Sequence, residues 1–336
     1  MLRNEAIRRC LIRRGWIPEQ DEESVALRFL AQGEYNENWL FSAPKGRRVL
    51  RINHGSQLGL TGQIEYEFRV LKLLENSGVT PRPLDVATDF CGLDQGALLM
   101  EYLPGKTLDY ERDAAKAARI FARIHSVAVP EAMFSLPVES GGLVCQPEPV
   151  RDIATESLEL IERHLADHAL PEVGARLLEF HAEIMELYAA TRAEFAEEPQ
   201  VLVNTEVNSG NFLIEGERAW LVDWEKAVLS SRHQDLGHFL TPTTTLWKTD
   251  YRFSPEARRS FLREYAKEWH RISGETLDFE ALDRRCAILE QTILLRGLSW
   301  CFMAYHEYTA TQRALRNADT FAVIKRYLDN SACFLA

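Results

Sequence analysis

The sequence lacks paired cysteines, a long apolar run and an excess of positive charge, and each absence excludes a class of protein. Its six cysteines form no CxxC pair and no Cys/His ligand spacing, which argues against a zinc site or a disulfide framework. The most apolar stretch, residues 293–305, contains Arg296 and is shorter than the roughly 20 residues that span a bilayer. With 39 basic against 50 acidic side chains, the net charge is −11, which does not suit a nucleic-acid surface. We therefore expect a reduced, cytoplasmic protein that binds neither membrane nor nucleic acid.

Charge is spread unevenly along the chain. Residues 1–20 carry five arginines against Glu5 and Glu19 and lack the apolar core of a secretory signal. Two interpretations remain, an ordinary N-terminal helix and a mitochondrial presequence, and Glu5 favours the helix. Residues 151–200 hold twelve carboxylates against four arginines, a net of −8. This acidic block either attracts a cationic ligand or is a solvated pair of helices.

The first third of the chain has the pattern of a small sheet. Short apolar or alternating runs separated by turn signals predict strands of one antiparallel sheet. A single helix interrupts them, with Ile64, Phe68, Leu71 and Leu74 on its apolar face and Glu67 on another face. The predicted strands are Val25–Leu30, Trp39–Ser42, Val49–Asn53 and Ala97–Leu103.

Helical periodicity dominates after Pro104-Gly105, apart from short strands around a polar loop at 201–222. We expect an α+β protein with a helical extension over residues 1–20, a small lobe over 21–103 and a mainly helical lobe over 104–336. The predicted long helices are Ala114–Val127, Thr155–Ala169, Ala175–Glu197, Pro255–Ser273 and Phe279–Tyr308.

Three oxygen-bearing side chains stand out around this loop: Glu206, Asn211 and Asp223. Asn211 precedes one short apolar run and Asp223 follows the next, so pairing of the two strands would bring them together. A carboxylate plus an amide oxygen suits Mg²⁺, and Glu206 could then face a nucleophile beside the metal. Each residue alone is equally explained as a surface or turn residue, and only their order and spacing favour a site.

The order of residues 202–214, 222–225 and 235–236 resembles the catalytic core of the aminoglycoside phosphotransferase and choline kinase family. The family pattern there is His-Gly-Asp, four residues, Asn, a hairpin, Asp-Trp/Phe-Glu and a later Asp-Leu. The resemblance implies a bilobal protein-kinase-like fold, with a small antiparallel sheet lobe and a larger helical lobe. It also implies ATP, Mg²⁺ and a small-molecule acceptor. Asn211 and Asp223 match its metal ligands, and Asp235 matches a residue that braces the catalytic loop through backbone N–H groups.

The resemblance extends to the first third of the chain. Gly33 and Asn36 match the turn that covers the nucleotide. Arg51 matches the basic residue that contacts the α- and β-phosphates, and Glu67 matches the helix carboxylate that pairs with it. A surface role for Arg51 and a solvated role for Glu67 are the alternatives. The family hinge, where backbone groups meet adenine, matches Met100, Glu101 and Tyr102.

One departure from the family pattern concerns the catalytic base. The chain has Asn204-Thr205-Glu206 where the family has His-Gly-Asp, so the base position holds a longer carboxylate without its supporting histidine. Either the loop is rebuilt so that Glu206 reaches the acceptor hydroxyl, or the chain is a catalytically weak nucleotide-binding protein that acts through a partner. A third hypothesis, an unrelated helical protein, requires all the ordered motifs to be accidental. We favour the active enzyme because the other matched residues are present.

The acceptor is less well specified than the reaction. Family members phosphorylate hydroxyls of aminoglycosides, choline, homoserine and sugars, and the acidic block favours a cationic, aminoglycoside- or amino-alcohol-like acceptor. The patterns set no oligomeric state. Five aromatic side chains are candidates for a cation-binding cage, although the helical spacing of Trp300, Tyr305 and Tyr308 is more typical of core residues. These are Trp247, Trp269, Trp300, Tyr305 and Tyr308.

Overall fold

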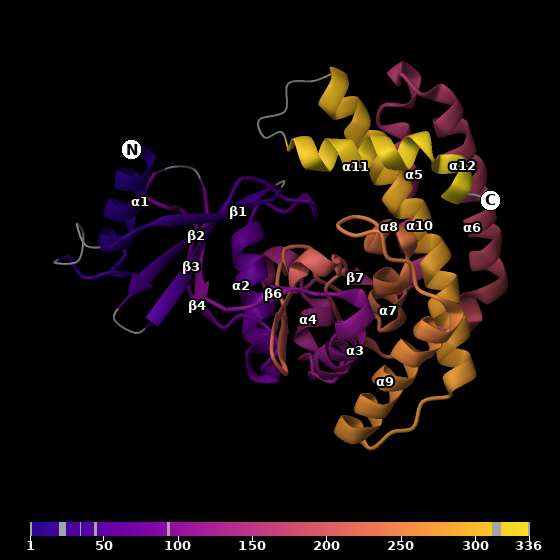
Figure 1. The fold of residues 1–336 in the computed structure, drawn as a ribbon, viewed down its shortest axis with the longest axis horizontal. Helices are drawn as coiled ribbons and strands as arrows, with labels where there is room; N and C mark the ends of the chain where they lie inside the picture. Colours follow the sequence, from indigo (N-terminus) through magenta and orange to yellow (C-terminus); the bar gives the residue numbers. More distant parts are fainter. Residues whose placement is uncertain are drawn as a thin grey trace. The chain divides into compact units, whose positions relative to one another are not determined.

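The chain folds into two compact units (Figure 1). The computed structural model describes residues 2–19, 25–33, 35–43, 46–92, 95–310 and 317–334. Unit 1 combines Met1–Lys106, Glu131–Leu143 and Leu213–Ala227, and unit 2 combines Thr107–Pro130, Val144–Phe212 and Val228–Ala336. The predicted bilobal α+β class is confirmed. Among the described residues, no helix has the length and apolarity needed to cross a membrane.

Unit 1 is built on an antiparallel sheet with the strand order β1-β2-β3-β5-β4. Residues 83–87 form the edge strand β4, which the sequence analysis did not predict because Pro81 and Pro83 look like a turn. An edge position explains why proline is tolerated there. The elements of unit 1 are α1 (Leu2–Arg13), β1 (Arg28–Gln32), β2 (Asn36–Ala43), β3 (Gly46–Asn53), α2 (Gln63–Leu74), β4 (Pro83–Ala87), β5 (Ala97–Glu101), α4 (Ala132–Ser135), β9 (Phe212–Glu215) and β10 (Arg218–Leu221).

Side chains of β3 alternate between the two faces of this sheet. Leu50 and Ile52 belong to the apolar cluster that also contains Ile7 and Leu11 of α1. Arg51, between them, points to the opposite face, where its guanidinium contacts α2. The N-terminal residues therefore form a helix that packs against the sheet, and β3 presents a buried arginine to α2.

Helix α2 buries Glu67 along with its apolar residues. Glu67 is 2% exposed, although the sequence analysis placed it away from the apolar face. It lies three residues after Ile64 and four before Leu71, both of which are buried, so all three share one helix face. A carboxylate on a buried face requires a charged partner, and Arg51 supplies it.

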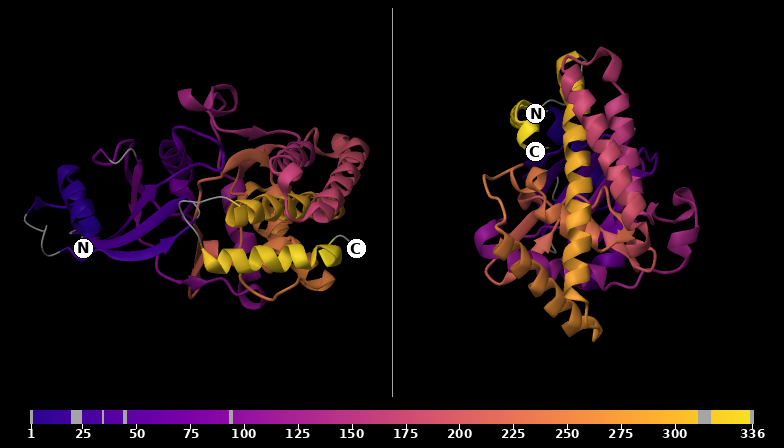
Figure 2. Two further views of the ribbon diagram at one scale, coloured as in Figure 1. Left: turned by 90° about the horizontal axis from the view of Figure 1, so that it is seen from above. Right: turned by 90° about the vertical axis from the view of Figure 1, so that its right-hand side faces the viewer.

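Unit 2 is mainly helical. Its long helix α10 packs against α5, α6, α7, α9 and α11, and the right-hand view of Figure 2 shows its orange ribbon running beside the rose-coloured pair α5 and α6. The elements are α3 (Tyr110–His125), β7 (Cys145–Gln146), α5 (Pro149–Glu162), α6 (Pro171–Phe195), β8 (Gln200–Val203), β11 (Val228–Ser231), α7 (His233–Leu240), α8 (Pro242–Thr245), α9 (Pro255–Ser273), α10 (Phe279–Ala310), α11 (Ala318–Asp329) and α12 (Ser331–Phe334); β6 (Lys106–Thr107) lies where the chain passes between the units.

Aromatic side chains of unit 2 serve mainly as core. Tyr308 is buried and stacks on Phe321 with ring centroids 5.2 Å apart, and Trp300 packs edge-on against Trp247 at 5.8 Å. Tyr305 belongs to the same apolar cluster. These contacts support the core interpretation of the aromatic residues rather than a cation-binding cage.

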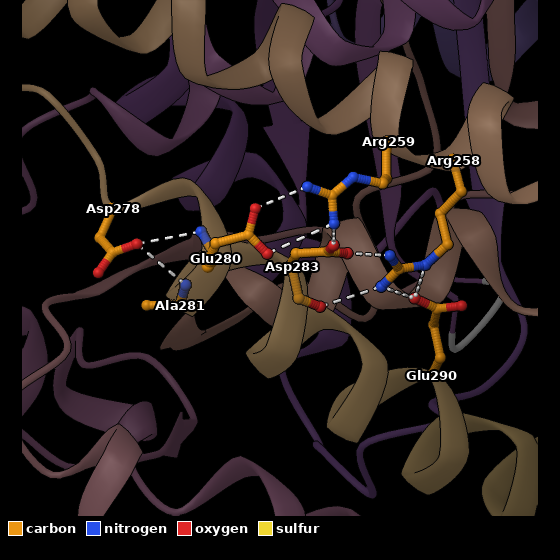
Figure 3. Close-up of polar contacts among 7 residues, drawn as sticks. All are labelled: Arg258, Arg259, Asp278, Glu280, Ala281, Asp283 and Glu290. Carbon is orange, nitrogen blue, oxygen red and sulfur yellow. Dashed lines mark hydrogen bonds and ion pairs between the residues drawn. The ribbon is translucent and has the colours of Figure 1, made fainter.

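Helices α9 and α10 are joined by a half-buried network of ion pairs (Figure 3). Arg258 donates from Nε to Glu290 Oε1 at 2.7 Å and is also paired with Asp283. Arg259 contacts Asp283 too, and its Nη2 lies 2.7 Å from Glu280 Oε1. Burial raises the pKa of Glu290, so this carboxylate depends on Arg258 to remain charged.

We predict that Arg258→Met lowers the free energy of unfolding by about 3 kcal/mol, because it leaves Glu290 and Asp283 in a poorly solvated site without their main partner. Arg259→Met is the matched control. Its side chain is 35% exposed and its partner Glu280 is 76% exposed, so the loss should be at most about 1 kcal/mol. Urea unfolding of both variants tests this, and equal losses would contradict it.

Candidate active site

Arg51 is the centre of a charge cluster in unit 1. Its Nε lies 3.1 Å from Glu67 Oε2 and its Nη2 lies 3.5 Å from Glu225 Oε2. The same Nη2 is also paired with Asp223. Arg51, Glu67 and Glu225 are all buried, whereas the side chain of Asp223 is 27% exposed. We call these four residues the Arg51 cluster.

The Arg51 cluster holds more negative than positive charge. Although burial alone would lower it, the carboxylates of Asp223 and Glu67 raise the pKa of Arg51, which therefore stays charged. Burial, together with the charge of Asp223, raises the pKa of Glu67 to about 7, against the opposing effect of Arg51. One guanidinium is thus shared among three carboxylates, and the most deeply buried of them takes up a proton near neutral pH.

Glu225 ties the Asp223 segment to the sheet and to α2. Asn36 donates from Nδ2 to Glu225 Oε2, and the backbone oxygen of Glu225 accepts a 2.7 Å hydrogen bond from Gln63 Nε2. Tyr66 donates to the backbone oxygen of Ala227 at 2.6 Å. The sequence analysis gave Glu225 no role. The only signal for one was its place in the Asp-Trp-Glu pattern, since its partners are far away in sequence.

The other predicted nucleotide-binding residues lie along the same sheet. Gly33 closes the turn between β1 and β2 by donating its N–H to the backbone oxygen of Asn36 at 2.8 Å. Glu34, in the same predicted turn, lies outside the described residues. Met100 is buried at the end of β5, and Glu101 Oε1 accepts the Arg82 N–H at 2.8 Å. The ring of Tyr102 stacks on Arg47, with Cζ 4.2 Å from its centroid.

The polar loop after β8, in unit 2, is held by Asp235. Its carboxylate accepts the N–H of Asn204 at 2.9 Å and the N–H of Thr205 at 2.9 Å. The predicted bracing role of Asp235 is confirmed by these bonds. His125 is buried against Asp235 and Tyr265, with its Nδ1 3.0 Å from the Tyr265 hydroxyl, as expected for a core residue.

Two side-chain bonds shape the rest of this loop. The N–H of Glu206 donates to Asn204 Oδ1 at 3.0 Å, so Asn204 holds the backbone of Glu206 from within the loop. Asn211 donates from Nδ2 to the Glu206 backbone oxygen at 2.6 Å. That bond uses the amide nitrogen of Asn211 and does not involve its amide oxygen, the atom that a metal would need.

Thr205 has a glycine-like backbone. Its φ is +65°, in the left-handed region, where the family pattern has glycine. Asp223, at φ +66°, is a second residue of this kind. A left-handed threonine costs about 1–2 kcal/mol because its branched Cβ approaches the following carbonyl oxygen. The backbone of Thr205 thus lies in the region that favours the glycine of the family pattern.

The Arg51 cluster suits a divalent cation. Asp223 and Glu225 supply hard carboxylate oxygens, which Mg²⁺ prefers, and the excess of negative charge calls for a cation. Asn211 directly precedes β9 and Asp223 follows β10 after one residue. The joint use of Glu206, Asn211 and Asp223 in one site stays a prediction.

A buried basic residue on strand β3 paired with a helix glutamate is a feature of protein kinases, where the basic residue is a lysine. The sequence matches the profile described as "Phosphotransferase enzyme family" over residues 26–274, and the chain belongs to this family. No curated protein sequence shows significant similarity to the chain.

Solved structures share the fold at low sequence identity. An ethanolamine kinase from Plasmodium vivax matches with a TM-score of 0.71 and 13% identity, covering 97% of this chain and 88% of that one. A choline/ethanolamine kinase family protein from Mesorhizobium loti matches at 0.64 and 18%, covering 100% and 95%. An amicoumacin kinase, solved in complex with AMP-PNP and Ca²⁺, matches at 0.59 and 17%, covering 96% and 92%. At these identities the likeness establishes the fold.

We predict that Thr205→Gly is more stable than Thr205→Ala by about 1 kcal/mol. Both variants lose the same side-chain contacts, and only glycine removes the Cβ that opposes the left-handed backbone. Thermal or urea unfolding of the two proteins measures the difference. Equal stabilities would mean that Thr205 carries no backbone strain.

The raised pKa of Glu67 predicts a pH effect. Because its pKa is higher in the folded than in the unfolded chain, its contribution to stability declines as pH rises from about 4.5 to about 7. Glu67→Gln should remove this decline, so its stability relative to the parent should improve across that range. Glu65→Gln, on the same helix, is the control and should leave the profile unchanged. If the stability of Glu67→Gln changed with pH in parallel with that of the parent protein, the raised pKa of Glu67 would be contradicted.

Proposed function

We propose that this chain transfers the γ-phosphate of ATP to a hydroxyl group of a small molecule, with Asn211 and Asp223 holding Mg²⁺. The observation that carries this proposal is the Arg51 cluster, in which one guanidinium is shared by three carboxylates. Mg²⁺, when bound, would neutralise charge on the phosphates and on Asp223.

In this proposal, different residues of the chain bind different parts of the nucleotide. Arg51, held by Glu67, would bind phosphate oxygens through its planar guanidinium. Gly33 and Asn36 would cover the nucleotide. The backbone of Met100, Glu101 and Tyr102 would meet the adenine. Phosphoryl transfer requires few covalent steps that involve the protein. Positioning of this kind, together with charge neutralisation, would therefore account for most of the rate enhancement.

Glu206 would accept the proton of the attacking hydroxyl. The support for an active loop is that Asp235 braces it, Asn204 bonds to the Glu206 N–H, and Thr205 keeps the left-handed backbone at the glycine position. Backbone strain of this kind persists only where surrounding bonds impose it, and it is concentrated at functional sites. These observations favour an active phosphotransferase over a weak nucleotide-binding protein.

A cationic acceptor, such as an amino alcohol, is the finer part of the proposal. The acidic block 151–200 supports it through long-range attraction. Part of this charge is internally paired, because arginines of α10 neutralise three of its carboxylates. The pairs are Glu156 with Arg296, Glu194 with Arg284 and Glu198 with Arg285. An acceptor panel with matched cationic, neutral and anionic alcohols tests this part separately from the reaction.

Mg²⁺ with AMP-PNP should raise the melting temperature of the parent protein by several degrees, because ligand binding stabilises the folded state. Asp223→Asn should reduce this shift strongly, and Glu217→Asn, on the exposed turn of the hairpin, should leave it intact. An equal shift in Asp223→Asn would remove Asp223 from the metal site.

Glu206→Gln should lower kcat for an acceptor found in the screen by about 10²–10⁴-fold, as expected for loss of a general base. It should leave the AMP-PNP thermal shift unchanged, because nucleotide binding does not require the base. Unchanged turnover would show that Glu206 is not the base. A parent protein that binds nucleotide but turns over no acceptor would support the pseudokinase alternative.

A further inference from the structure

The N-terminal helix α1 is fastened to the turn between β4 and β5. Trp16, just after α1, donates from Nε1 to Asp85 Oδ2 at 2.7 Å, and its ring stacks on Phe90 with centroids 5.8 Å apart. Arg14 donates from Nη2 to the backbone oxygen of Asp89 at 2.5 Å. Three contacts thus bring the residues at the end of α1 against β4 and this turn within unit 1.

Two cysteine thiols meet among these contacts. Cys10, on α1, is 6% exposed, and Cys91, in the turn, is half-buried. Cys10 belongs to the apolar cluster between α1 and the sheet, and Cys91 packs against that cluster. The side chain of Cys91 is close enough to that of Cys10 to raise the pKa of the Cys10 thiol through a hydrogen bond. The sequence offered no signal for this pair, because the two cysteines lie far apart along the chain and form no motif.

The backbone at Cys91 is unusual for a cysteine. Its φ is +62°, and Gly92 follows with φ +74°, so two successive residues are left-handed. Gly92 donates its N–H to Asp89 Oδ1 at 2.6 Å, and Phe90 donates to the backbone oxygen of Gln95 at 2.8 Å, which fixes the turn. Asparagine, aspartate or glycine would adopt this conformation more easily. A strained cysteine facing a second thiol points to chemistry rather than to packing.

We propose that Cys10 and Cys91 form a reversible redox pair, which a peroxide converts into a disulfide that locks α1 onto the sheet of unit 1. Redox-sensing disulfides of this kind occur in otherwise reduced proteins. The pair is independent of the phosphotransferase residues.

The two cysteines have different parts in this reaction. Burial, reinforced by the neighbouring Cys91, raises the pKa of Cys10 to about 12, which makes Cys10 the poorer thiolate. The more exposed Cys91 would therefore attack hydrogen peroxide first, breaking the O–O bond to give a sulfenic acid and one water. The Cys10 sulfur then attacks the Cys91 sulfur, its proton leaves with the hydroxyl as a second water, and the S–S bond forms. Two thiols are oxidised, one peroxide is reduced, and a dithiol reverses the step.

The remaining cysteines serve as controls. Cys286 and Cys301 are buried in unit 2, Cys145 is half-buried in β7, and Cys333 is exposed on α12. A Cys333→Ser background removes the exposed thiol that would link two chains. Within it, Cys145→Ser is the matched control for a half-buried cysteine.

The test treats the full chain in the Cys333→Ser background with hydrogen peroxide. We expect two thiols to be lost on titration after denaturation, and the tryptic peptide of residues 10–13 to be recovered linked to the peptide containing Cys91. Cys91→Asn, which suits the left-handed backbone, should abolish the linkage without impairing folding, whereas Cys145→Ser should keep it. Absence of the linked peptide, or linkage between two chains, would overturn the proposal.

Protection of α1 provides a second readout. Arg13 and Arg14 are exposed trypsin sites at the end of this helix. Oxidation should slow cleavage there by about tenfold, because the disulfide opposes local opening of α1. A dithiol should restore the original rate. Cleavage at an unchanged rate in the linked protein would show that the disulfide does not lock the helix.

Discussion

Unit 1 depends on the ion pairs that the buried guanidinium of Arg51 makes with three carboxylates. A charge with so little access to water is stable only with partners, and its partners come from α2 and from the segment after β10. Removal of any one of the three carboxylates would change the electrostatic interaction of Arg51 with the remaining two. The same cluster contains more carboxylates than one arginine can neutralise, which prepares it for a further cation. Stability and the capacity to bind a charged ligand thus arise from one set of side chains.

In unit 2 a single carboxylate organises the polar loop after β8. Asp235 accepts two backbone N–H groups and is itself packed against His125. Because this brace acts on backbone, it tolerates changes in the loop side chains. Thr205 is an example, since its backbone is left-handed although its branched side chain opposes that conformation.

Local patterns predicted much of the fold and less of the site. The helix α9 begins and ends where its sequence predicted, because capping and periodicity act over a few residues. Arg51, Glu67 and Asp235 could be recognised because they lie in ordered motifs. The bond between Asn36 and Glu225 could not, since it joins segments far apart in sequence. The left-handed backbone of Thr205 could not be predicted either, because threonine disfavours it and only tertiary bonds impose it.

Unit 1 is discontinuous, since its last segment, Leu213–Ala227, follows long after Lys106. A ribosome adding about 5–20 residues per second needs roughly ten seconds to make the intervening chain. During that time Arg51 and Glu67 exist without Asp223 and Glu225. All five strands of the sheet are made before this interval, but two of the three carboxylates that pair with Arg51 are not. A gene fragment that encodes only residues 1–106 therefore does not specify the whole of unit 1. Two carboxylates that pair with Arg51, those of Asp223 and Glu225, are encoded after most of the first half of unit 2.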